Sequence, residues 1–141
     1  MTLVLDASVV AKWFFEELDS DKARDILIGC GKGEIRLLAP EILPAEIANS
    51  LSKRVIRRVL GAEEALAQYS RFERVCPSLV SISSLADLAL RIALANRHPV
   101  YDCLYVGLAT KMRCDLLTAD EKLYDVFSNA IPEVKLLRDW A

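Results

Sequence analysis

The chain has 141 residues, of which 53% are hydrophobic and 27% are charged, and its formal net charge at pH 7 is −2. A folded chain of this size buries about two thirds of its surface, so this composition excludes a disordered tail or a fibre and makes disulfide bonds unnecessary for stability. The slightly negative charge excludes a histone-like binder, because a nucleic acid would have to be held by a local basic patch or by metal ions.

The cysteine and histidine content argues against a zinc site. The four cysteines are widely scattered, no pair has the spacing of a metal-binding motif, and His98 is the only histidine. We expect the cysteines to be buried thiols in a reducing compartment. The longest stretch without Asp, Glu, Lys or Arg, residues 75–86, is too short to cross a bilayer, and Asp6 interrupts any early signal-peptide run. These features predict a soluble, cytoplasmic protein.

Short apolar strands alternate with helices along the first half of the chain. The patterning predicts, in order, a strand at 2–6, a helix at 7–17, a helix from Asp19 or Ser20 to about Gly29, a strand at 35–39, and a long amphipathic helix at 41–59 that ends before Gly61.

The alternation continues through the second half. There we expect a helix at 62–74, a strand at 79–82, a helix at 84–95, a helix at 101–111 that starts after Pro99, a strand at 116–118, a helix at 120–127, and a last strand at 134–137.

Apolar strands separated by helices indicate a parallel sheet that is covered on both faces. The predicted fold is therefore a three-layer α/β/α sandwich with a central, mainly parallel sheet of four to five strands, and residues 1–141 are expected to form a single domain. In such sheets, ligands bind beyond the carboxyl ends of the strands, near the point where the strand order reverses. Residues that directly follow strands are therefore the first candidates for a functional site.

Two acidic residues follow predicted strands, and each has a simple structural interpretation. Asp6 ends the first strand, where a carboxylate either caps the next helix or belongs to a site at the sheet edge. Asp120 follows the strand at 116–118, and Thr118 with Glu121 fits a capping box at the start of the next helix. Helix capping alone would account for both carboxylates.

Two further acids lie on predicted helices. Asp102 has Tyr105, Val106 and Ala109 at helical contact spacing, so it lies against an apolar surface where a lone carboxylate needs a cation, a donor or a proton. The alternative is an exposed first-turn Asp favoured by the helix dipole. Glu46 has polar neighbours at +3 and +4, and its default interpretation is a solvated helix residue.

Taken together, the four acids are more informative than any one of them. If they converge at the sheet edge they require a cation, and an oxygen-only ligand set favours Mg²⁺ or Mn²⁺ over zinc. Metal-assisted phosphodiester hydrolysis suits such a cluster and needs no histidine base. His98 is accordingly expected to be a loop residue and not a catalyst.

Four segments resemble, in order, the motifs of PIN-domain proteins, and in particular VapC-type toxins of type II toxin–antitoxin systems. The segments are 3–8, 39–49, 101–109 and 117–120, so the resemblance spans nearly the whole chain. The resemblance implies a metal-dependent endoribonuclease in which Asp6, Glu46, Asp102 and Asp120 are the catalytic and metal-binding acids.

The same resemblance implies further roles and partners. Ser8 and Thr118 match the small hydroxyl positions that orient the carboxylates or a metal-bound water. Family members form homodimers and are silenced by a cognate antitoxin. Cys103 departs from the family pattern, which more often has a small residue there, and this should affect packing more than chemistry.

A basic cluster on the long helix is the candidate RNA-binding surface. Its members are Lys53, Arg54, Arg57 and Arg58, which are expected to fall on one side of the helix that carries Glu46. A solvated helix face is the alternative. The aromatic run at 13–15 is interpreted as core or interface packing in preference to base stacking.

Two other functions remain open from the sequence. A catalytically inactive module that acts by binding an antitoxin or another protein would keep the same fold and acids. A phosphoacceptor signalling domain also has a doubly wound fold and an acidic Mg²⁺ pocket, although only Asp6 follows the first strand here and Lys135 is the only candidate for a lysine beside the last strand.

Overall fold

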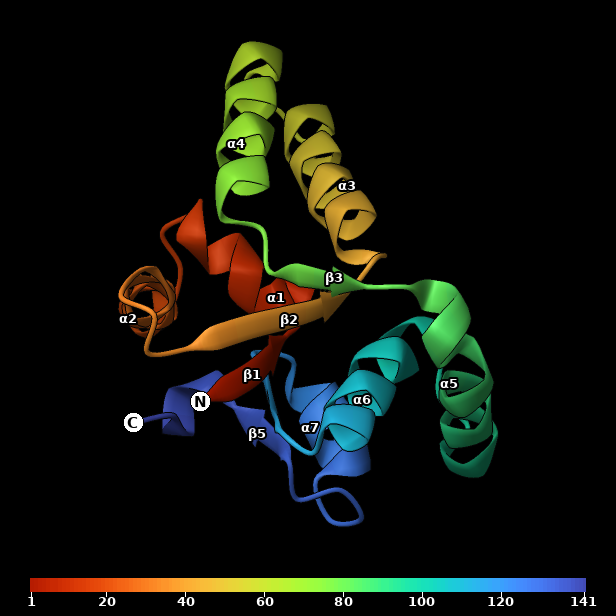
Figure 1. Ribbon diagram of the computed structural model, residues 1–141. Helices are drawn as coiled ribbons and strands as arrows, with labels where there is room; N and C mark the ends of the chain where they lie inside the picture. The colour runs from red at the N-terminus through yellow and green to blue at the C-terminus, as the bar shows by residue number, and fades with distance from the viewer.

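The computed structural model describes residues 1–141 and contains a five-stranded sheet in the order β3-β2-β1-β4-β5 (Figure 1). All four neighbouring pairs are parallel. The strands are β1 Thr2–Leu5, β2 Arg36–Pro40, β3 Ser78–Val80, β4 Asp115–Thr118 and β5 Val134–Leu136. The parallel sheet of five strands confirms the predicted sheet.

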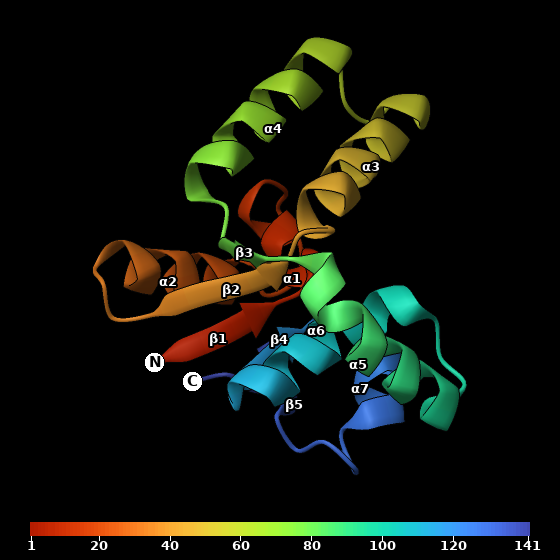
Figure 2. The same cartoon turned by 45° about the vertical axis from the view of Figure 1, so that its right-hand side comes forward.

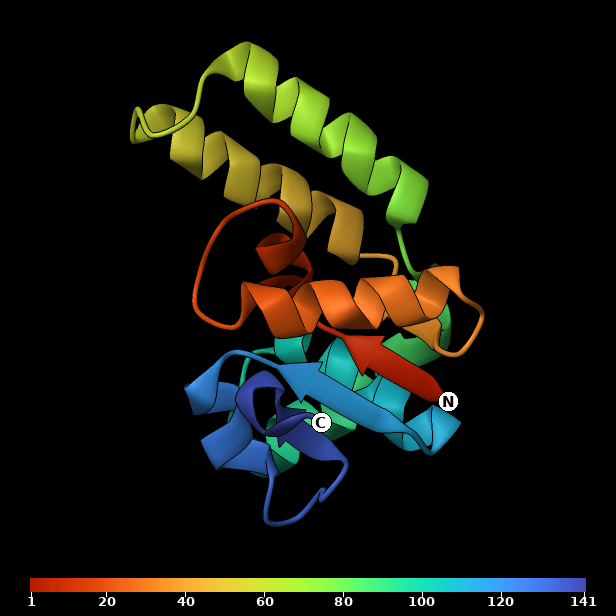
Figure 3. The same ribbon diagram turned by 90° about the vertical axis from the view of Figure 1, so that its left-hand side faces the viewer.

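Seven α-helices and two short 3-10 helices connect the strands. They are α1 Ala7–Val10, η1 Ala11–Trp13, α2 Ser20–Gly31, α3 Leu43–Ile56, α4 Ala62–Val75, α5 Ile82–Asn96, α6 Val100–Met112, α7 Glu121–Phe127 and η2 Leu137–Asp139. Helices α2 and α6 lie on opposite faces of the sheet, as Figures 1 and 3 show together, and this confirms the three-layer sandwich. None of these helices combines the length and the apolar character that crossing a bilayer requires.

The core packs around the central strands, and α6 contributes a long buried stretch to it. Leu3, Val4 and Leu5 of β1 are almost completely buried because β1 is paired on both sides, with β2 and with β4. Helix α6 is buried at every position from Cys103 to Ala109, since it lies between the sheet and α5. A helix that is apolar on all sides is suited to such an inner layer.

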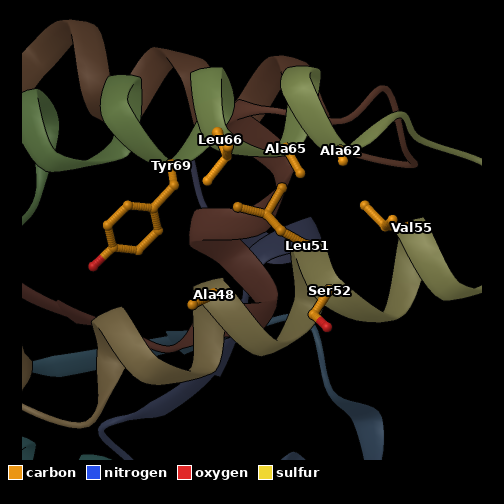
Figure 4. A pocket seen from close by; sticks show the side chains of 8 residues that line it. All are labelled: Ala48, Leu51, Ser52, Val55, Ala62, Ala65, Leu66 and Tyr69. Carbon is orange, nitrogen blue, oxygen red and sulfur yellow. The ribbon is translucent and has the colours of Figure 1, made fainter.

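Helices α3 and α4 form a hairpin that projects from the sheet in all three views (Figures 1, 2 and 3). An apolar groove of about 480 Å³ runs between the two helices, and only one of its eight lining residues, Ser52, is not hydrophobic (Figure 4). Helix α4 buries only one residue, Phe72, whose ring contacts those of Phe14 and Tyr69.

Two helices end at least three residues before the predicted position. The first helical segment ends at Trp13 and not at residue 17, because the Ser20 hydroxyl accepts from the Glu17 amide and donates to the Phe15 carbonyl, which turns the chain. The long helix α3 ends at Ile56 and not at residue 59, because Arg58 has a left-handed backbone with φ 61°.

The expectation of four buried thiols is only partly correct. Cys103 is buried in α6, whereas Cys30, Cys76 and Cys114 are half-buried. Of the aromatic run, Trp13 is in the core, where its indole N–H donates to the Ala23 carbonyl oxygen at 2.8 Å, and Phe14 and Phe15 pack against the core. Packing is therefore the correct interpretation of this run.

Candidate active site

The strand order reverses between β1 and β4, and Asp6 lies at the carboxyl end of β1 at this point. The Asp6 amide donates to the Leu117 carbonyl oxygen at 3.4 Å, which joins the ends of the two strands. The Asp6 residue is only 6% exposed, so its carboxylate lies inside the sheet edge. This is the position at which parallel α/β sheets bind ligands.

The Asp6 carboxylate accepts three hydrogen bonds. Its Oδ1 accepts from the Ser8 hydroxyl and from the Val9 amide at 3.3 Å, and its Oδ2 accepts from the Thr118 hydroxyl. Asp6 is thus the N-cap of α1 as well as part of the sheet-edge cluster, so the two interpretations of this residue do not exclude each other.

Ser8 and Thr118 hold Asp6 and also tie the end of β4 to the end of β1. The Ser8 hydroxyl accepts from the Ala119 amide at 2.9 Å, and the Thr118 hydroxyl accepts from the Asp120 amide at 3.0 Å. Each hydroxyl oxygen therefore accepts from a backbone amide, and the hydroxyl proton is donated to the Asp6 carboxylate.

The predicted capping box at Thr118 is wrong. Asp120 itself is the N-cap of α7, where its Oδ1 accepts from the Lys122 amide at 2.9 Å and the Leu123 amide at 3.3 Å. Glu121 does not reach back; it forms an ion pair with Arg138 at 2.6 Å. Asp102 does lie in the first turn of α6, as the dipole interpretation requires, but it has a partner as well.

That partner is His98. Its Nε2 lies 2.7 Å from Asp102 Oδ2, and because an ionised carboxylate only accepts, the ring N–H is the donor. The imidazole ring also packs edge-on against Phe127, with the ring centroids 5.1 Å apart. His98 is a loop residue, as predicted, but its contact with Asp102 was missed, although the spacing of four residues between them was a signal.

Glu46 also has a partner that the sequence did not identify. The Tyr105 hydroxyl donates to Glu46 Oε1 at 2.7 Å, which joins α6 to the first turn of α3. The Tyr105 residue is 2% exposed, so its ring is fixed by the core. From the sequence, Tyr105 was only part of an apolar surface near Asp102.

The charge of Asp102 acts on two of the other acids, Asp6 and Glu46. Burial raises the pKa of Asp6 to about 6, against the hydrogen bonds from Ser8, Thr118 and Val9, and the Asp102 charge raises it further. Burial also raises the pKa of Glu46, the Tyr105 hydrogen bond lowers it, and the Asp102 charge again adds to the increase. Asp6 and Glu46 are thus both within electrostatic reach of Asp102.

Burial, followed by the Glu46 charge, raises the pKa of Tyr105, and the charges of Asp6 and Asp102 contribute too. The Tyr105 hydroxyl therefore lies among three carboxylates. The fourth acid, Asp120, is exposed, and its charge is not among the causes that raise the pKa of Asp6 or Glu46. The structure brings Asp6, Glu46 and Asp102 together and leaves Asp120 at the rim.

The donor chemistry of this cluster fits a hard divalent cation. The groups are all carboxylate oxygens, and a cation would stabilise the ionised forms of Asp6 and Glu46, whose pKa values are raised by burial and, to a smaller extent, by the Asp102 charge. As the side chains lie, no set of three His, Cys, Asp or Glu residues is arranged to hold a metal ion. Binding would therefore require side-chain movement.

The four basic residues do not form the single helix face that the sequence predicted. Arg54 is engaged within the protein, because it forms an ion pair with Glu17 at 2.9 Å and lies 3.6 Å above the Phe15 ring. Arg57 caps the end of α3, and Arg58 lies beyond it with its left-handed backbone. Lys53, Arg57 and Arg58 are exposed.

The family model for the PIN domain matches residues 3–127 of the chain. Ribonuclease VapC3 of Pyrobaculum aerophilum is 33% identical over 129 residues, which cover 90% of this chain and 95% of that protein. Ribonuclease VapC9 of Mycobacterium tuberculosis is 32% identical over 90 residues, which cover 64% of this chain and 69% of that protein.

Two solved structures have a similar fold. PAE2754 from Pyrobaculum aerophilum aligns with a TM-score of 0.67 at 19% identity, covering 98% of this chain and 93% of that one. VapBC2 from Rickettsia felis, bound to a DNA fragment from its promoter, aligns with a TM-score of 0.65 at 17% identity, covering 96% and 97%. By the extent of the family match and of the similarity to VapC3, this chain belongs to the PIN domain family.

Proposed function

We propose that the protein is a metal-dependent endoribonuclease and the toxin component of a type II toxin–antitoxin system. The observation that carries the proposal is the cluster of Asp6, Glu46 and Asp102 at the point where the strand order reverses, in which hydroxyl groups of neighbouring residues hold Asp6 and Glu46. Relatives over most of the chain are named ribonucleases, which supports the same activity. Membership of the PIN family argues against the phosphoacceptor alternative.

Asp6, Glu46, Asp102 and Asp120 are the residues that would hold Mg²⁺ or Mn²⁺. When bound there, such an ion polarises the scissile phosphoryl group and lowers the pKa of an attacking water. The two backbone amides at the start of α7 both donate to Asp120 Oδ1. Its other carboxylate oxygen, Oδ2, is therefore available at the rim of the cluster.

Four neighbouring side chains act on the acids. Ser8 and Thr118 fix both oxygens of Asp6, His98 fixes one oxygen of Asp102, and Tyr105 fixes one oxygen of Glu46. Each donor stabilises the ionised form of its acid and limits its rotation. In our proposal these residues position the acids and do not themselves react with RNA.

Lys53 and Arg57 are the residues that we propose contact RNA phosphates. Both are exposed and neither forms an ion pair, whereas Arg54 is held by Glu17 and Phe15. Lys53 lies seven residues after Glu46 on α3, so phosphates along this face would lead toward the acids. A cognate antitoxin and a second copy of the chain are the protein partners that we infer from the family.

The test is cleavage of a mixed pool of transfer and ribosomal RNA by the purified protein with Mg²⁺, Mn²⁺ or a chelator. We expect cuts that need the metal and that disappear in Asp102→Asn, which removes a charge but little volume. Asp25→Asn, at an exposed position on α2 that forms no ion pair, is the matched control and should cut like the wild type. Undiminished cleavage by a folded Asp102→Asn variant would contradict the proposal, and a metal-binding protein that cuts nothing would favour the inactive binding module.

A further inference from the structure

A shallow pocket of about 290 Å³ opens beside Glu46. It is lined by Ile42, Ala45, Glu46, Asn49 and Tyr101, so a candidate catalytic carboxylate forms part of its wall. Its volume is at the small end of the range for sites that bind small organic groups, which run from about 300 Å³ upwards. The pocket differs from the groove between α3 and α4 in having a carboxylate and an amide among its five residues, since the polar side-chain groups of the groove are the hydroxyls of Ser52 and Tyr69.

Tyr101 supplies an exposed aromatic face to this pocket. The residue is 64% exposed, whereas Tyr69, Tyr105 and Tyr124 are half-buried or buried. Tyr101 lies four residues before Tyr105 on α6, and residues at this spacing share a helix face. Since Tyr105 reaches Glu46, the same face of α6 brings the Tyr101 ring to the side of that carboxylate.

Helix α3 supplies polar groups along the other side of the pocket. Asn49 lies three residues after Glu46, is exposed, and makes no side-chain hydrogen bond within the protein. Its amide offers both a donor and an acceptor, which is what a base edge requires. Lys53 lies one further turn along this face, exposed and without an ion pair.

We propose that this pocket is a nucleobase subsite, in which one unpaired base of the RNA stacks on Tyr101 with its edge facing Asn49. The inference rests on the proposed ribonuclease function and specifies how that site takes its substrate. Stacking on an aromatic ring is the common way in which proteins hold single-stranded bases, and an exposed base edge is read by amide side chains. A base held here places its own phosphate beside Glu46, and the neighbouring phosphates run toward Lys53.

The experiment uses the full chain and an RNA oligonucleotide that spans a wild-type cut site found in the transfer and ribosomal RNA pool. We compare wild type, Tyr101→Ala, Tyr101→Phe and, as a control at an exposed apolar position on α5, Leu94→Ala, which is 72% exposed in the wild type. The expected result for Tyr101→Ala is a rise in KM of roughly 5- to 100-fold, the loss that follows removal of one base–aromatic stack, with a much smaller change in kcat. Tyr101→Phe and Leu94→Ala should keep the wild-type KM.

An abasic scan of the same oligonucleotide identifies the base. Removing one base next to the cut should raise the wild-type KM by a similar factor, and should have little further effect on Tyr101→Ala, because the two changes remove the same contact. Asn49→Ala should weaken the preference among the four bases at that position.

The outcomes separate the subsite from the proposed function. If the wild type cuts RNA and Tyr101→Ala has the same KM, the subsite is overturned but the proposed function is not. The same holds if removing the base raises the KM of Tyr101→Ala by as large a factor as it raises that of the wild type. Unchanged RNA cleavage by Tyr101→Ala together with lost binding of a protein partner would assign the pocket to that partner. Failure of the wild type to cut any RNA removes the proposed function and the subsite with it.

Discussion

At the scale of single residues, the neighbours of each acid decide what the acid can do. Asp6 is buried and held by three donors, Asp102 is held by His98, and Glu46 is held by Tyr105. Three carboxylates at one sheet edge destabilise the protein when all are ionised, because burial and mutual repulsion both favour the protonated form. Binding of a cation would offset this destabilisation, so the cluster is expected to lower the stability of the metal-free protein and to provide a binding site for the cation.

Asp6→Asn should stabilise the metal-free protein at neutral pH. The pKa of Asp6 is raised from 3.8 to about 6 on folding, so between these pH values the folded state keeps a proton that the unfolded state has lost. Stability therefore falls as the pH rises from about 4 to 6 and stays lower above it, by up to about 3 kcal/mol. In the Asp6→Asn variant, the side-chain oxygen can keep the bonds to Ser8 and Val9, and the amide can donate to the second lone pair of Thr118.

Urea unfolding in the presence of a chelator at pH 7.5 and at pH 4 measures this effect. We expect Asp6→Asn to be more stable than the wild type at pH 7.5 and the difference to vanish near pH 4. The Asp25→Asn control, at an exposed position, should match the wild type at both pH values. A variant that is less stable than the wild type at pH 7.5 would show that burial does not disfavour the Asp6 charge.

Tyr105→Phe should weaken metal binding while the fold is kept. The change removes only the hydroxyl that donates to Glu46, and the ring stays in its buried position. Loss of such a supporting contact typically reduces metal affinity or activity about 10- to 100-fold. Titration calorimetry with Mn²⁺ measures the affinity, and Tyr124→Phe, at a half-buried tyrosine whose hydroxyl donates no hydrogen bond, is the control. Unchanged Mn²⁺ affinity in Tyr105→Phe would remove Tyr105 from the site.

His98→Ala should have an effect of similar size through Asp102, and His98→Gln should recover part of it. Gln keeps an N–H donor at the end of its side chain, whereas Ala keeps neither the donor nor the contact with Phe127. The same calorimetry with Mn²⁺ distinguishes positioning from packing. If the His98→Gln variant binds Mn²⁺ no more tightly than the His98→Ala variant does, the hydrogen bond to Asp102 does not contribute to the Mn²⁺ affinity.

The residues that the sequence could identify are those with a recognisable pattern. Asp6 and Asp120 follow strands, Asp102 and Glu46 lie on predicted helices that could reach the same edge, and the resemblance added the hydroxyls of Ser8 and Thr118. Tyr105 was missed because its hydroxyl meets Glu46 across 59 residues of chain, and no local pattern reports such a contact. The exposure of Tyr101 could not be predicted, because nothing in the sequence distinguishes an exposed tyrosine from a core tyrosine one turn away.

At the scale of elements, the two helices of the α3–α4 hairpin are anchored unequally, because α3 buries three residues and α4 only one. Helix α4 buries only Phe72, whose ring lies 6.3 Å from that of Phe14 and 5.6 Å from that of Tyr69. The hairpin nevertheless matters for the site, because the first turn of α3 carries Glu46.

Phe72→Ala should release α4 and destabilise the protein by about 3–5 kcal/mol, the usual cost of removing a buried aromatic ring. Leu66→Ala on the same helix is the control, since Leu66 is 74% exposed, and its effect should stay within about 0.5 kcal/mol. Urea unfolding measures both, and hydrogen exchange should show faster exchange in α4 than in α6. Equal stability of the two variants would mean that α4 is held by other contacts.

Helix and strand order could be predicted from the sequence, but several boundaries could not. The predicted end of α3 at residue 59 followed the amphipathic pattern, which gives no indication of the left-handed backbone at Arg58. The same error produced the prediction of one basic face, because Arg57 and Arg58 lie at and beyond the end of the helix and Arg54 turns toward Glu17.

At the scale of the whole molecule, the topology explains why distant acids meet. The strand order β3-β2-β1-β4-β5 places β1 beside β4, so Asp6 and Thr118 become neighbours across 112 residues of chain. A sequence of alternating apolar strands and helices predicts a parallel sheet, and the reversal of strand order follows only from its connections. The sheet edge at which the candidate acids lie could therefore be predicted, and the unequal exposure of the four acids could not.

A divalent cation should stabilise the whole molecule, because it binds the folded cluster and not the unfolded chain. At a Mn²⁺ concentration 100 times the Kd, the stabilisation is about 2.7 kcal/mol, or roughly 5–10 °C in Tm for a chain of this length. Thermal unfolding with and without Mn²⁺ at constant ionic strength measures it, and Ca²⁺ and Na⁺ provide the comparison. A Tm that does not respond to Mn²⁺ would contradict binding by the folded acids.

The most direct test of the account measures Mn²⁺ affinity and RNA cleavage on the same preparations of wild type, Asp6→Asn and Asp102→Asn, with Asp25→Asn as the control. If the acids at the edge of β1 and α6 hold the metal that cleavage requires, both variants lose Mn²⁺ binding and cutting together, while the control keeps both. Cleavage that persists in a chelator, or in folded variants that no longer bind Mn²⁺, would contradict the central claim that this carboxylate cluster is a metal-dependent active site.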